Sequence, residues 1–304
     1  MKELKGKVAA VTGAASGLGR SMALAFAAEG MDVALADVDE VSLSTVQEEI
    51  LAKDVRAITL KVDVSQAEQV EGFRDQALTR LGGLHVVCNN AGVSPLGAVW
   101  ENSVADWQWI LGVNLWGVIH GVRAFAPHLI AQNEGHIVNT ASVAGLIAPP
   151  GSGAYNVTKH AVVALSESLQ HDLRERGSRV GVSVLCPAYV PTRITESERS
   201  RPKNLPAGEK SAQTLAREAM LKKAVTSGKV SADEVAQAVV AAIKQERFYV
   251  LTHPRIKGAI QARMEDILQE RAPRNPMALQ DRPEEGRPRE GGAPVSRTGK
   301  PRRA

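Results

Sequence analysis

The stretch Val8-Ala9-Ala10-Val11-Thr12-Gly13-Ala14-Ala15-Ser16-Gly17-Leu18-Gly19 (residues 8–19) decides the fold. Its first five residues form an apolar run typical of a buried strand, and a helical pattern begins near Leu18. Glycines at such a strand-to-helix turn let the backbone approach a pyrophosphate, which the positive end of the helix then stabilises. The spacing of Gly13, Gly17 and Gly19, with Ser16 and Leu18 between them, therefore predicts a dinucleotide site. Glycines also mark ordinary turns, so the rest of the chain has to decide.

Outward from this loop, short apolar runs alternate with helical patterns through the first two-thirds of the chain. Such alternation is the signature of βαβ units and a parallel sheet. Strands are predicted at 7–12, 32–37, 56–62, 85–89, 135–140, 180–186 and 248–251. Helices are predicted at 18–29, 41–51, 67–81, 107–129, 155–176 and 231–244. The expected fold class is α/β, a Rossmann-type doubly wound seven-stranded parallel sheet with helices on both faces.

Two segments break the alternation. Residues 188–228 are polar and rich in charge, and they follow the end of a strand, where an active-site lid belongs. Residues 272–304 combine six prolines and four glycines with almost no apolar side chains, a composition that cannot offset the entropy lost on ordering. We therefore expect a single Rossmann-fold catalytic domain at 1–272 and a disordered, basic, Pro/Gly-rich tail at 273–304.

The charge balance separates the body of the chain from its tail. The 304 residues have a net charge of +4, but residues from 271 onward hold nine Lys/Arg and four Asp/Glu, so the rest is close to neutral. A body that binds nucleic acid is not supported, although an adaptor that binds nucleic acid through the tail stays an alternative. No apolar run is long enough to span a bilayer, so no membrane partner is expected.

The only two cysteines, Cys88 and Cys186, each end an apolar run and are predicted to be buried small hydrophobic residues. With no disulfide framework and no export signal, a reducing cytoplasm is the expected location. His120, His128 and His160 lie on predicted helices without ligand partners at useful spacing, so no metal site is expected.

The second strand ends at Asp37, eighteen residues beyond Gly19. A carboxylate at this place can accept hydrogen bonds from the ribose hydroxyls of an adenosine. The same charge would repel a 2′-phosphate, and residues 14–16 and Val38 offer no positive side chain against it. NAD is therefore predicted as the cofactor in preference to NADP, with Asp37 as a simple turn residue as the alternative.

More motifs follow in register with the glycine loop: Asn89-Asn90-Ala91-Gly92, then Ser142, then Tyr155-Asn156-Val157-Thr158-Lys159. In this order and spacing, residues 7–251 resemble the short-chain dehydrogenase/reductase family, in its branch with Tyr-x-x-x-Lys and Gly-x-x-x-Gly-x-Gly. The resemblance implies an NAD-dependent alcohol dehydrogenase or reductase whose single domain holds both cofactor and substrate. Residues 194–202 and 248–272 look similar to a branch that includes aryl-ether Cα-dehydrogenases.

The reaction can also be argued from the residues. Tyr155 and Lys159 are four apart on a predicted helix and share a face, and a nearby ammonium should lower the pKa of the phenol from about 10. Ser142, just beyond the strand 135–140, can donate to a carbonyl or alkoxide oxygen. The resemblance implies that Tyr155 exchanges a proton with the substrate oxygen and that Lys159 also binds the nicotinamide ribose. It implies that Asn114 holds a water that links the lysine to solvent; a buried Asn that only satisfies backbone groups is the alternative.

The remaining cofactor contacts are implied by the resemblance alone. They are Asp63 and Val64 at the adenine, Asn90, Ala91 and Gly92 along the ribose and nicotinamide, and Pro187, Ala188, Val190 and Thr192 after the sixth strand. Ala188 stands where the family commonly has glycine. The resemblance also implies a homodimer or homotetramer, with helices 107–129 and 155–176 at the interfaces.

The substrate pocket is predicted from 93–96, 143–149, Tyr189 and parts of the lid. Most of these residues are apolar, so we expect a secondary alcohol and its ketone on a hydrophobic or aromatic small molecule. Trp107 and Trp109 are interpreted as packing residues. An NADPH-dependent carbonyl reductase and a non-catalytic nucleotide-binding scaffold are the alternatives.

Overall fold

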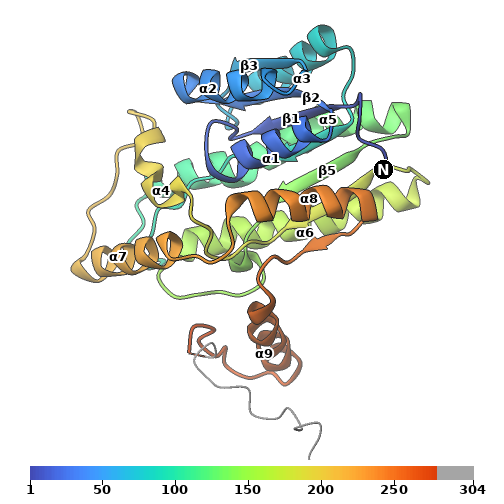
Figure 1. The fold of residues 1–304 in the computed structure, drawn as a ribbon. Coiled ribbons are helices and arrows are strands. Elements are labelled where there is room, and N and C mark those ends of the chain that lie inside the picture. The colour runs from blue at the N-terminus through green and yellow to red at the C-terminus, as the bar shows by residue number, and fades with distance from the viewer. Residues whose placement is uncertain (279–304) are drawn as a thin grey trace, which may run out of the picture.

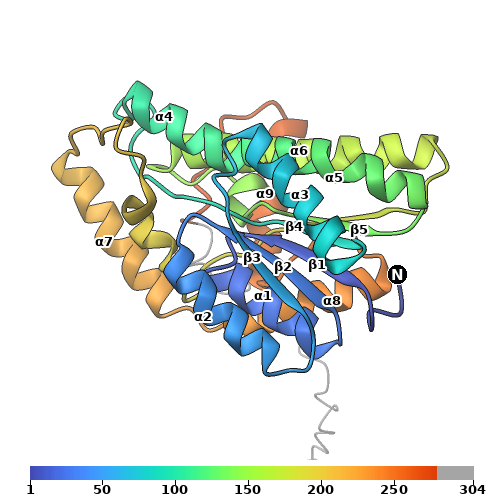
Figure 2. The same cartoon turned by 90° about the horizontal axis from the view of Figure 1, so that it is seen from above.

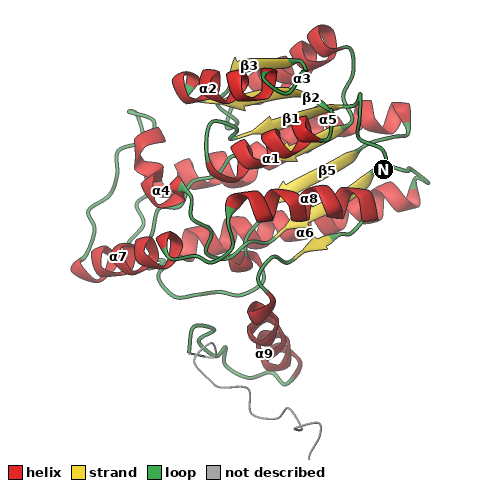
Figure 3. Cartoon of the chain, viewed as in Figure 1, coloured by secondary structure: helices red, strands yellow, loops and turns green. Residues whose placement is uncertain are grey.

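In the computed structural model, which describes residues 1–278, seven parallel strands form one sheet in the order β3-β2-β1-β4-β5-β6-β7 (Figure 1). The strands are β1 Val8–Thr12, β2 Asp32–Asp37, β3 Ala57–Lys61, β4 Val86–Asn89, β5 His136–Thr140, β6 Gly181–Leu185 and β7 Tyr249–Val250. Figure 3 shows the sheet between layers of helices. The predicted fold class, a Rossmann-type doubly wound parallel sheet, is confirmed.

Both faces of the sheet are buried because successive strand residues point to opposite sides. In β1, Ala9 and Val11 pack on one face, and Val8 and Ala10 pack on the other. The first face is covered by α1 (Gly17–Ala28), α2 (Glu40–Leu51) and α8 (Ala232–Gln245), and the second by α3 (Ala67–Leu81), α5 (Gly117–Gln132) and α6 (Gly153–Glu175) (Figure 2). Two buried faces explain why the strands read as continuous apolar runs.

The order of the strands fixes the place of the site. The chain runs outward from β1 through β2 to β3, then returns to place β4 on the other side of β1. At this switch point the loops after β1 and β4 diverge, which leaves a crevice at the carboxyl ends of the strands. The glycine loop follows β1 and Asn90 follows β4, so both face the crevice.

The helix predicted at 107–129 forms, but it runs from 104 to 132, and a π-helical turn interrupts its α-helical geometry. Ser103 begins α4 (Val104–Leu111) with a capping box that it shares with Asp106, and a π-helical turn, η1 (Gly112–Trp116), separates α4 from α5. A Cβ at Gly117 would lie 2.6 Å from the Val64 side chain. The glycine thus lets the helix pass close to the strand-end loop that carries Val64.

The predicted lid, 188–228, contains more secondary structure than its composition suggested. It holds the 3₁₀-helix η3 (Arg193–Ser200) and the helix α7 (Ala212–Thr226), which begins where Ser211 accepts a hydrogen bond from the backbone of Thr214. Shorter 3₁₀ turns lie at η2 (Val143–Gly145) and η4 (Pro254–Ile256).

The C-terminal helix α9 (Lys257–Leu268) was not predicted. Beyond it, residues 273–278 of the predicted tail are described, and the Arg274 guanidinium donates to the Asp266 carboxylate at 2.9 Å. The rest of the predicted tail, 279–304, lies outside the described residues. Across residues 1–278, no helix has the length and apolarity to cross a membrane.

Candidate active site

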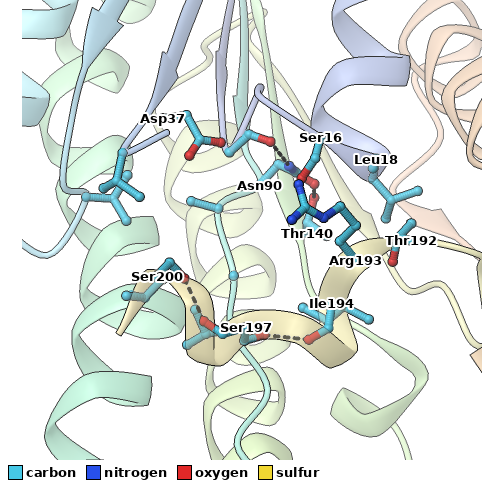
Figure 4. Close-up of a pocket in the computed structure, with 18 of the residues that line it drawn as sticks. Ser16, Leu18, Asp37, Asn90, Thr140, Thr192, Arg193, Ile194, Ser197 and Ser200 are labelled. Atoms are coloured by element: carbon cyan, nitrogen blue, oxygen red, sulfur yellow. Dashed lines mark hydrogen bonds between the residues drawn. The ribbon is translucent and has the colours of Figure 1, made fainter. Parts of the chain in front are cut away.

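A cavity of about 540 Å³ lies at the carboxyl ends of the strands, between the sheet and the lid. Most of the predicted site residues line it: Gly13, Ser16, Gly17, Leu18, Asp37, Asp63, Val64, Asn90, Ala91, Gly92, Ser142, Tyr155, Lys159, Pro187, Ala188, Val190 and Thr192. Gly19 and Asn114 are the two predicted residues that do not. In Figure 4, Asp37, Ser16 and Asn90 lie on the sheet side of this cavity, and Ile194, Ser197 and Ser200 of η3 lie across from them.

The glycine loop forms a cradle that side chains would fill. Gly13 has a φ of +66°, and a Cβ there would lie 2.8 Å from the Cα of Ala91. A Cβ at Gly19 would lie 2.0 Å from the carbonyl oxygen of Gly13, so Gly19 allows the close packing of the loop on its helix and does not itself line the cavity. The exposed backbone of this turn fits the close approach of a dinucleotide pyrophosphate.

Asp37 is held in place by its own surroundings. One of its carboxylate oxygens accepts from the backbone N–H of Ala15 at 3.0 Å, and the other accepts from the N–H of Asp39 at 3.1 Å. The carboxylate therefore connects the end of β2 to the glycine loop and still faces the cavity. Its free lone pairs suit it to accept hydrogen bonds from ribose hydroxyls.

Thr12 has a role that the sequence motif alone did not reveal. Its hydroxyl donates to the carbonyl of Cys88 and accepts from the backbone N–H groups of Asn90 at 2.9 Å and Ala91 at 3.1 Å. The Asn90 side chain returns a hydrogen bond to the carbonyl of Thr12 at 3.0 Å. These bonds join the loops after β1 and β4 across the switch point.

The buried end of the cavity brings together three of the four residues predicted to carry the reaction, and Asn114 is the fourth. Lys159 and Ser142 are buried, and the Lys159 ammonium lies 5.6 Å from the centre of the Tyr155 ring. The ammonium donates to the carbonyl oxygen of Thr140 at 2.8 Å, and the Ser142 hydroxyl donates to the carbonyl of Pro187 at 3.3 Å. Three elements thus meet at this end of the cavity: the end of β5, the helix α6 and the loop after β6.

Burial controls the protonation of this cluster. It raises the pKa of Tyr155, and the hydrogen bond with Ser142 only partly offsets that effect. The pKa of this phenol is therefore raised in the protein alone, and the lowering expected from Lys159 stays a prediction. Burial also lowers the pKa of Lys159 to about 8, because an ammonium loses hydration in this setting.

Asn114 sits on the π-helical turn η1 and is fully buried. Its side-chain oxygen accepts from the N–H of Val93 at 2.8 Å, and its nitrogen donates to the carbonyl of Val93 at 2.9 Å and to the hydroxyl of Thr158 at 3.4 Å. These contacts fix the loop after β4 against α6. The water-holding role of Asn114 stays a prediction.

The lid is fastened to the body by a buried ion pair. Arg201 donates to the Asp106 carboxylate at 2.7 Å, and both side chains are only 8% exposed. The guanidinium also lies 4.1 Å from the centre of the Trp109 ring, and Trp109 is a buried packing residue that also lines the cavity. Farther along the lid, the Thr214 hydroxyl donates to the Glu101 carboxylate at 2.7 Å.

Replacing Arg201 by Met should loosen the lid, because Asp106 would keep a buried charge without its partner. Breaking such a pair costs about 3–5 kcal/mol. Limited proteolysis should then cut residues 201–210 faster than in the wild type, while the surface variant Lys203→Met should change the rate little. Adding Asp106→Asn to Arg201→Met should restore part of the resistance; equal cutting of Arg201→Met and the wild type would contradict the fastening role.

The predicted substrate pocket was only partly correct. Val93 lines the cavity, but residues 94–96, residues 143–149 and Tyr189 do not. Val143 and Ile147 instead pack on the C-terminal segment that includes Ile256, and the Tyr189 hydroxyl contacts the sulfur of Met277 at 3.9 Å. Parts of the lid line the cavity, as predicted, and the lining residues there are Arg193, Ile194, Ser197, Arg199, Ser200, Pro202, Leu205 and Val225. Gln108 of α4 and Val113 of η1 also line it and were not predicted.

Two further expectations concern sulfur and metal. Cys88 and Cys186 are both buried and form no disulfide, as predicted, and burial raises the pKa of the Cys186 thiol to about 12. Within residues 1–278, no group of His, Cys, Asp or Glu side chains has an arrangement that could hold a metal ion.

Comparison with known proteins identifies the family. Residues 7–203 match the family described as short chain dehydrogenase. The chain belongs to the short-chain dehydrogenase/reductase family. As a member of this family it is an oxidoreductase that binds a nicotinamide cofactor and acts on a small molecule.

Three relatives illustrate the match to this family. The crystal structure of a short-chain dehydrogenase/reductase from Burkholderia phymatum in complex with NAD shares 49% identity, has a TM-score of 0.88 and covers 90% of this chain and 98% of its own. A CLA biosynthesis dehydrogenase/reductase from Lactiplantibacillus plantarum is 33% identical, over 90% of this chain and 97% of that protein. A 1-deoxy-11-beta-hydroxypentalenate dehydrogenase from Streptomyces exfoliatus is 34% identical, over 87% and 89%.

Proposed function

We propose that the protein is an NAD(H)-dependent dehydrogenase/reductase that interconverts a secondary alcohol and a ketone on a hydrophobic or aromatic small molecule. The observation that carries the proposal is one continuous cavity. Its buried end holds Tyr155, Lys159 and Ser142, and its other end holds the glycine loop and Asp37. The glycine loop and Asp37 would hold the pyrophosphate and the adenosine ribose of a dinucleotide, and Tyr155 and Lys159 would hold its nicotinamide end.

The residues of the chain then have separate tasks. The nicotinamide cofactor, when bound, supplies the acceptor or donor of the hydride. Tyr155 acts as general acid/base and moves a proton between its hydroxyl and the substrate oxygen, and Ser142 donates a hydrogen bond to that oxygen. Lys159, which is held by Thr140, would bind the cofactor ribose and would favour the phenolate as it forms. Asn114 positions the loop that carries Val93.

The walls near Tyr155 support the substrate class. Val93, Trp109 and Leu205 pack in one apolar cluster with the Tyr155 ring, and Val113 adds to it. An apolar wall stabilises a bound apolar substrate through the hydrophobic effect and keeps water away from the proton transfer. A neutral alcohol with a hydrocarbon or aromatic body fits this end of the cavity better than a charged one.

The first test of the function is fluorescence titration of the purified protein with NADH and with NADPH at fixed salt. NADH should bind more tightly, after which aromatic and aliphatic secondary alcohols are screened with NAD⁺ by the appearance of NADH absorbance. Binding of neither dinucleotide would end the proposal. Support for NAD comes from Asp37 and from the 49% identical relative that was crystallised with NAD.

An NADPH-dependent carbonyl reductase is the second candidate, because the lid brings the positive side chains of Arg193 and Arg199 close to Asp39, just after Asp37. The hydrogen bonds from Ser42 lower the pKa of the Asp39 carboxyl most, and the two arginines lower it further. The residues next to the glycine loop in the sequence, 14–16 and Val38, carry no positive charge, so the sequence did not indicate this possibility.

Replacing Asp37 by Ala tests this choice. The ratio of NADH to NADPH affinity should fall by about 10-fold or more, since hydrogen bonds to a charged acceptor contribute about 1.5–3 kcal/mol and the repulsion of a 2′-phosphate is removed as well. The measurement is the same pair of titrations on the variant. Asp75→Ala, which removes an exposed carboxylate from α3, should leave the ratio unchanged. A ratio that does not move in Asp37→Ala would show that the carboxylate does not select the cofactor.

We also propose a homo-oligomer, a dimer or tetramer, in the cytoplasm. Trp116 and Val157 are each 50% exposed on the segments expected at the interfaces, η1 and α6, which suits contact with a second copy. Light scattering coupled to size-exclusion chromatography measures the mass in solution, and a monomer would contradict the oligomer.

A further inference from the structure

We propose that Arg199, with Arg193 beside it, binds the pyrophosphate of the dinucleotide, so that cofactor binding holds the lid closed. This inference rests on the dinucleotide cleft of the proposed function. It adds a part that the family motifs do not contain, because both arginines belong to η3 of the lid.

The first observation is the position of the two guanidinium groups. Arg193 and Arg199 line the same cavity as Gly13, Ser16 and Gly17 of the glycine loop. The Arg199 guanidinium lies 3.4 Å from the Ser16 hydroxyl, a contact between residues 183 positions apart in the sequence. Figure 4 shows the Arg193 side chain extending from η3 toward the side of the cavity that holds Ser16.

The second observation is the charge of the glycine loop. Residues 13–19 contain no charged side chain, and Arg20, the next residue, forms an ion pair with Glu49 of α2. Among the described residues, the cavity lining holds three positive side chains: Lys159, Arg193 and Arg199. Lys159 lies with Tyr155, so the positive charge near the glycine loop comes from the two arginines of the lid. A pyrophosphate carries two negative charges, and a charge-assisted bond to it is about twice as strong as a neutral one such as the long contact with Ser16.

The third observation is how η3 is held. On one side of the 3₁₀-helix, Arg201 is fixed to Asp106 and Trp109 of the body. On the other side, Arg199 reaches the glycine loop only through the Ser16 hydroxyl, while its other nitrogen donates to the carbonyls of Arg193 at 3.0 Å and Glu196 at 3.1 Å. A phosphate oxygen at this place would give the lid a second firm attachment, across the cavity from the first.

The test is NADH and NADPH fluorescence titration of Arg199→Gln and Arg193→Gln against a matched control, Lys203→Gln, which removes a positive charge from an exposed part of the same lid. Arg199→Gln should weaken the binding of both dinucleotides by about 10-fold, and Arg193→Gln by less, because the loss removes a charge-assisted hydrogen bond. Lys203→Gln should stay within about twofold of the wild type. Raising the salt concentration should weaken binding less in Arg199→Gln than in the wild type.

A second readout follows the lid itself. NADH should protect residues 201–210 of the wild type from limited proteolysis and should protect Arg199→Gln much less. Arg199→Lys, which keeps the charge, should recover part of the affinity. Arg199 also donates to backbone carbonyls of η3, so its replacement could disturb the helix itself. Arg193→Gln is free of this problem, because among the described residues the Arg193 guanidinium pairs only with the exposed side chain of Glu196.

The outcomes separate this inference from the proposed function. Wild-type protein that binds neither dinucleotide would defeat both. Wild-type protein that binds NADH, with Arg199→Gln and Arg193→Gln binding it as tightly as Lys203→Gln does, would overturn the inference alone. A loss confined to NADPH would place the guanidinium groups at the 2′-phosphate and would also overturn the assignment to the pyrophosphate.

Discussion

Replacing Tyr155 by Phe should lower the turnover number by a factor of roughly 10²–10⁴, the usual contribution of a positioned general acid/base. The change removes one hydroxyl from a site that is otherwise intact, so the affinity for NADH should stay within about twofold of the wild type. The measurement is the rate of NADH formation with the best alcohol from the screen, at saturating NAD⁺.

Tyr249→Phe is the matched control for this change. Tyr249 is 45% exposed, and its hydroxyl donates to Glu167 on the surface, away from the cavity. Its variant should keep wild-type turnover. If Tyr155→Phe also kept it, Tyr155 would have no part in the proton transfer and the proposed mechanism would fail.

Replacing Lys159 by Met should abolish most of the activity and, at the same time, make the protein more stable. Burial lowers the pKa of Lys159 from 10.5 to about 8, so its charge is unfavourable in the folded state at neutral pH. The difference between these pKa values corresponds to a cost on the order of 3 kcal/mol. Loss of the charge-assisted hydrogen bond to Thr140 offsets about 1.5–3 kcal/mol of this gain, so thermal unfolding at pH 7 should shift upward by up to about 6 °C.

The pH dependence of this effect has a definite sign. Below pH 8 the lysine is charged in both the folded and the unfolded state, so the full free-energy cost of burying its charge lowers the stability of the wild type. Between pH 8 and 10.5 the unfolded chain binds the proton more tightly than the folded one, so the wild type gains stability relative to the variant as the pH rises. Urea unfolding of both proteins at pH 7 and at pH 10 measures it. A variant that is less stable than the wild type at pH 7 would contradict the lowered pKa.

The elements that the sequence predicted well are those with strong local patterns. The apolar run of β1, the glycine loop and the capped start of α8 at Ser231 each depend on neighbours along the chain, and each lies where it was expected. Apart from Gly19, the residues predicted for the cofactor end, and Tyr155 with Lys159, line one cavity, because their spacing is fixed by one loop and one helix turn.

The rest depends on contacts between distant segments. The close approach of Gly117 to Val64 is a contact between segments far apart in the chain, and no periodicity within the helix reports it. The raised pKa of Tyr155 depends on how deeply the ring is buried, while the spacing to Lys159 suggested the opposite direction. The lid was judged by its polar composition, yet it contains the helix α7, and Arg201 attaches it to Asp106 of the body.

The attachment of Arg201 to Asp106 and Trp109 limits how substrate specificity can be transferred from one family member to another. The segment that follows β6 and the helix α4 both contribute to the lining of the cavity, and these two carry the halves of one ion pair. A chimera that took the lid of a relative alone would separate those halves unless the relative had the same pairing. Exchange of specificity between family members therefore requires residues 188–228 and 93–113 to be transplanted together, as a single module encoded in two places.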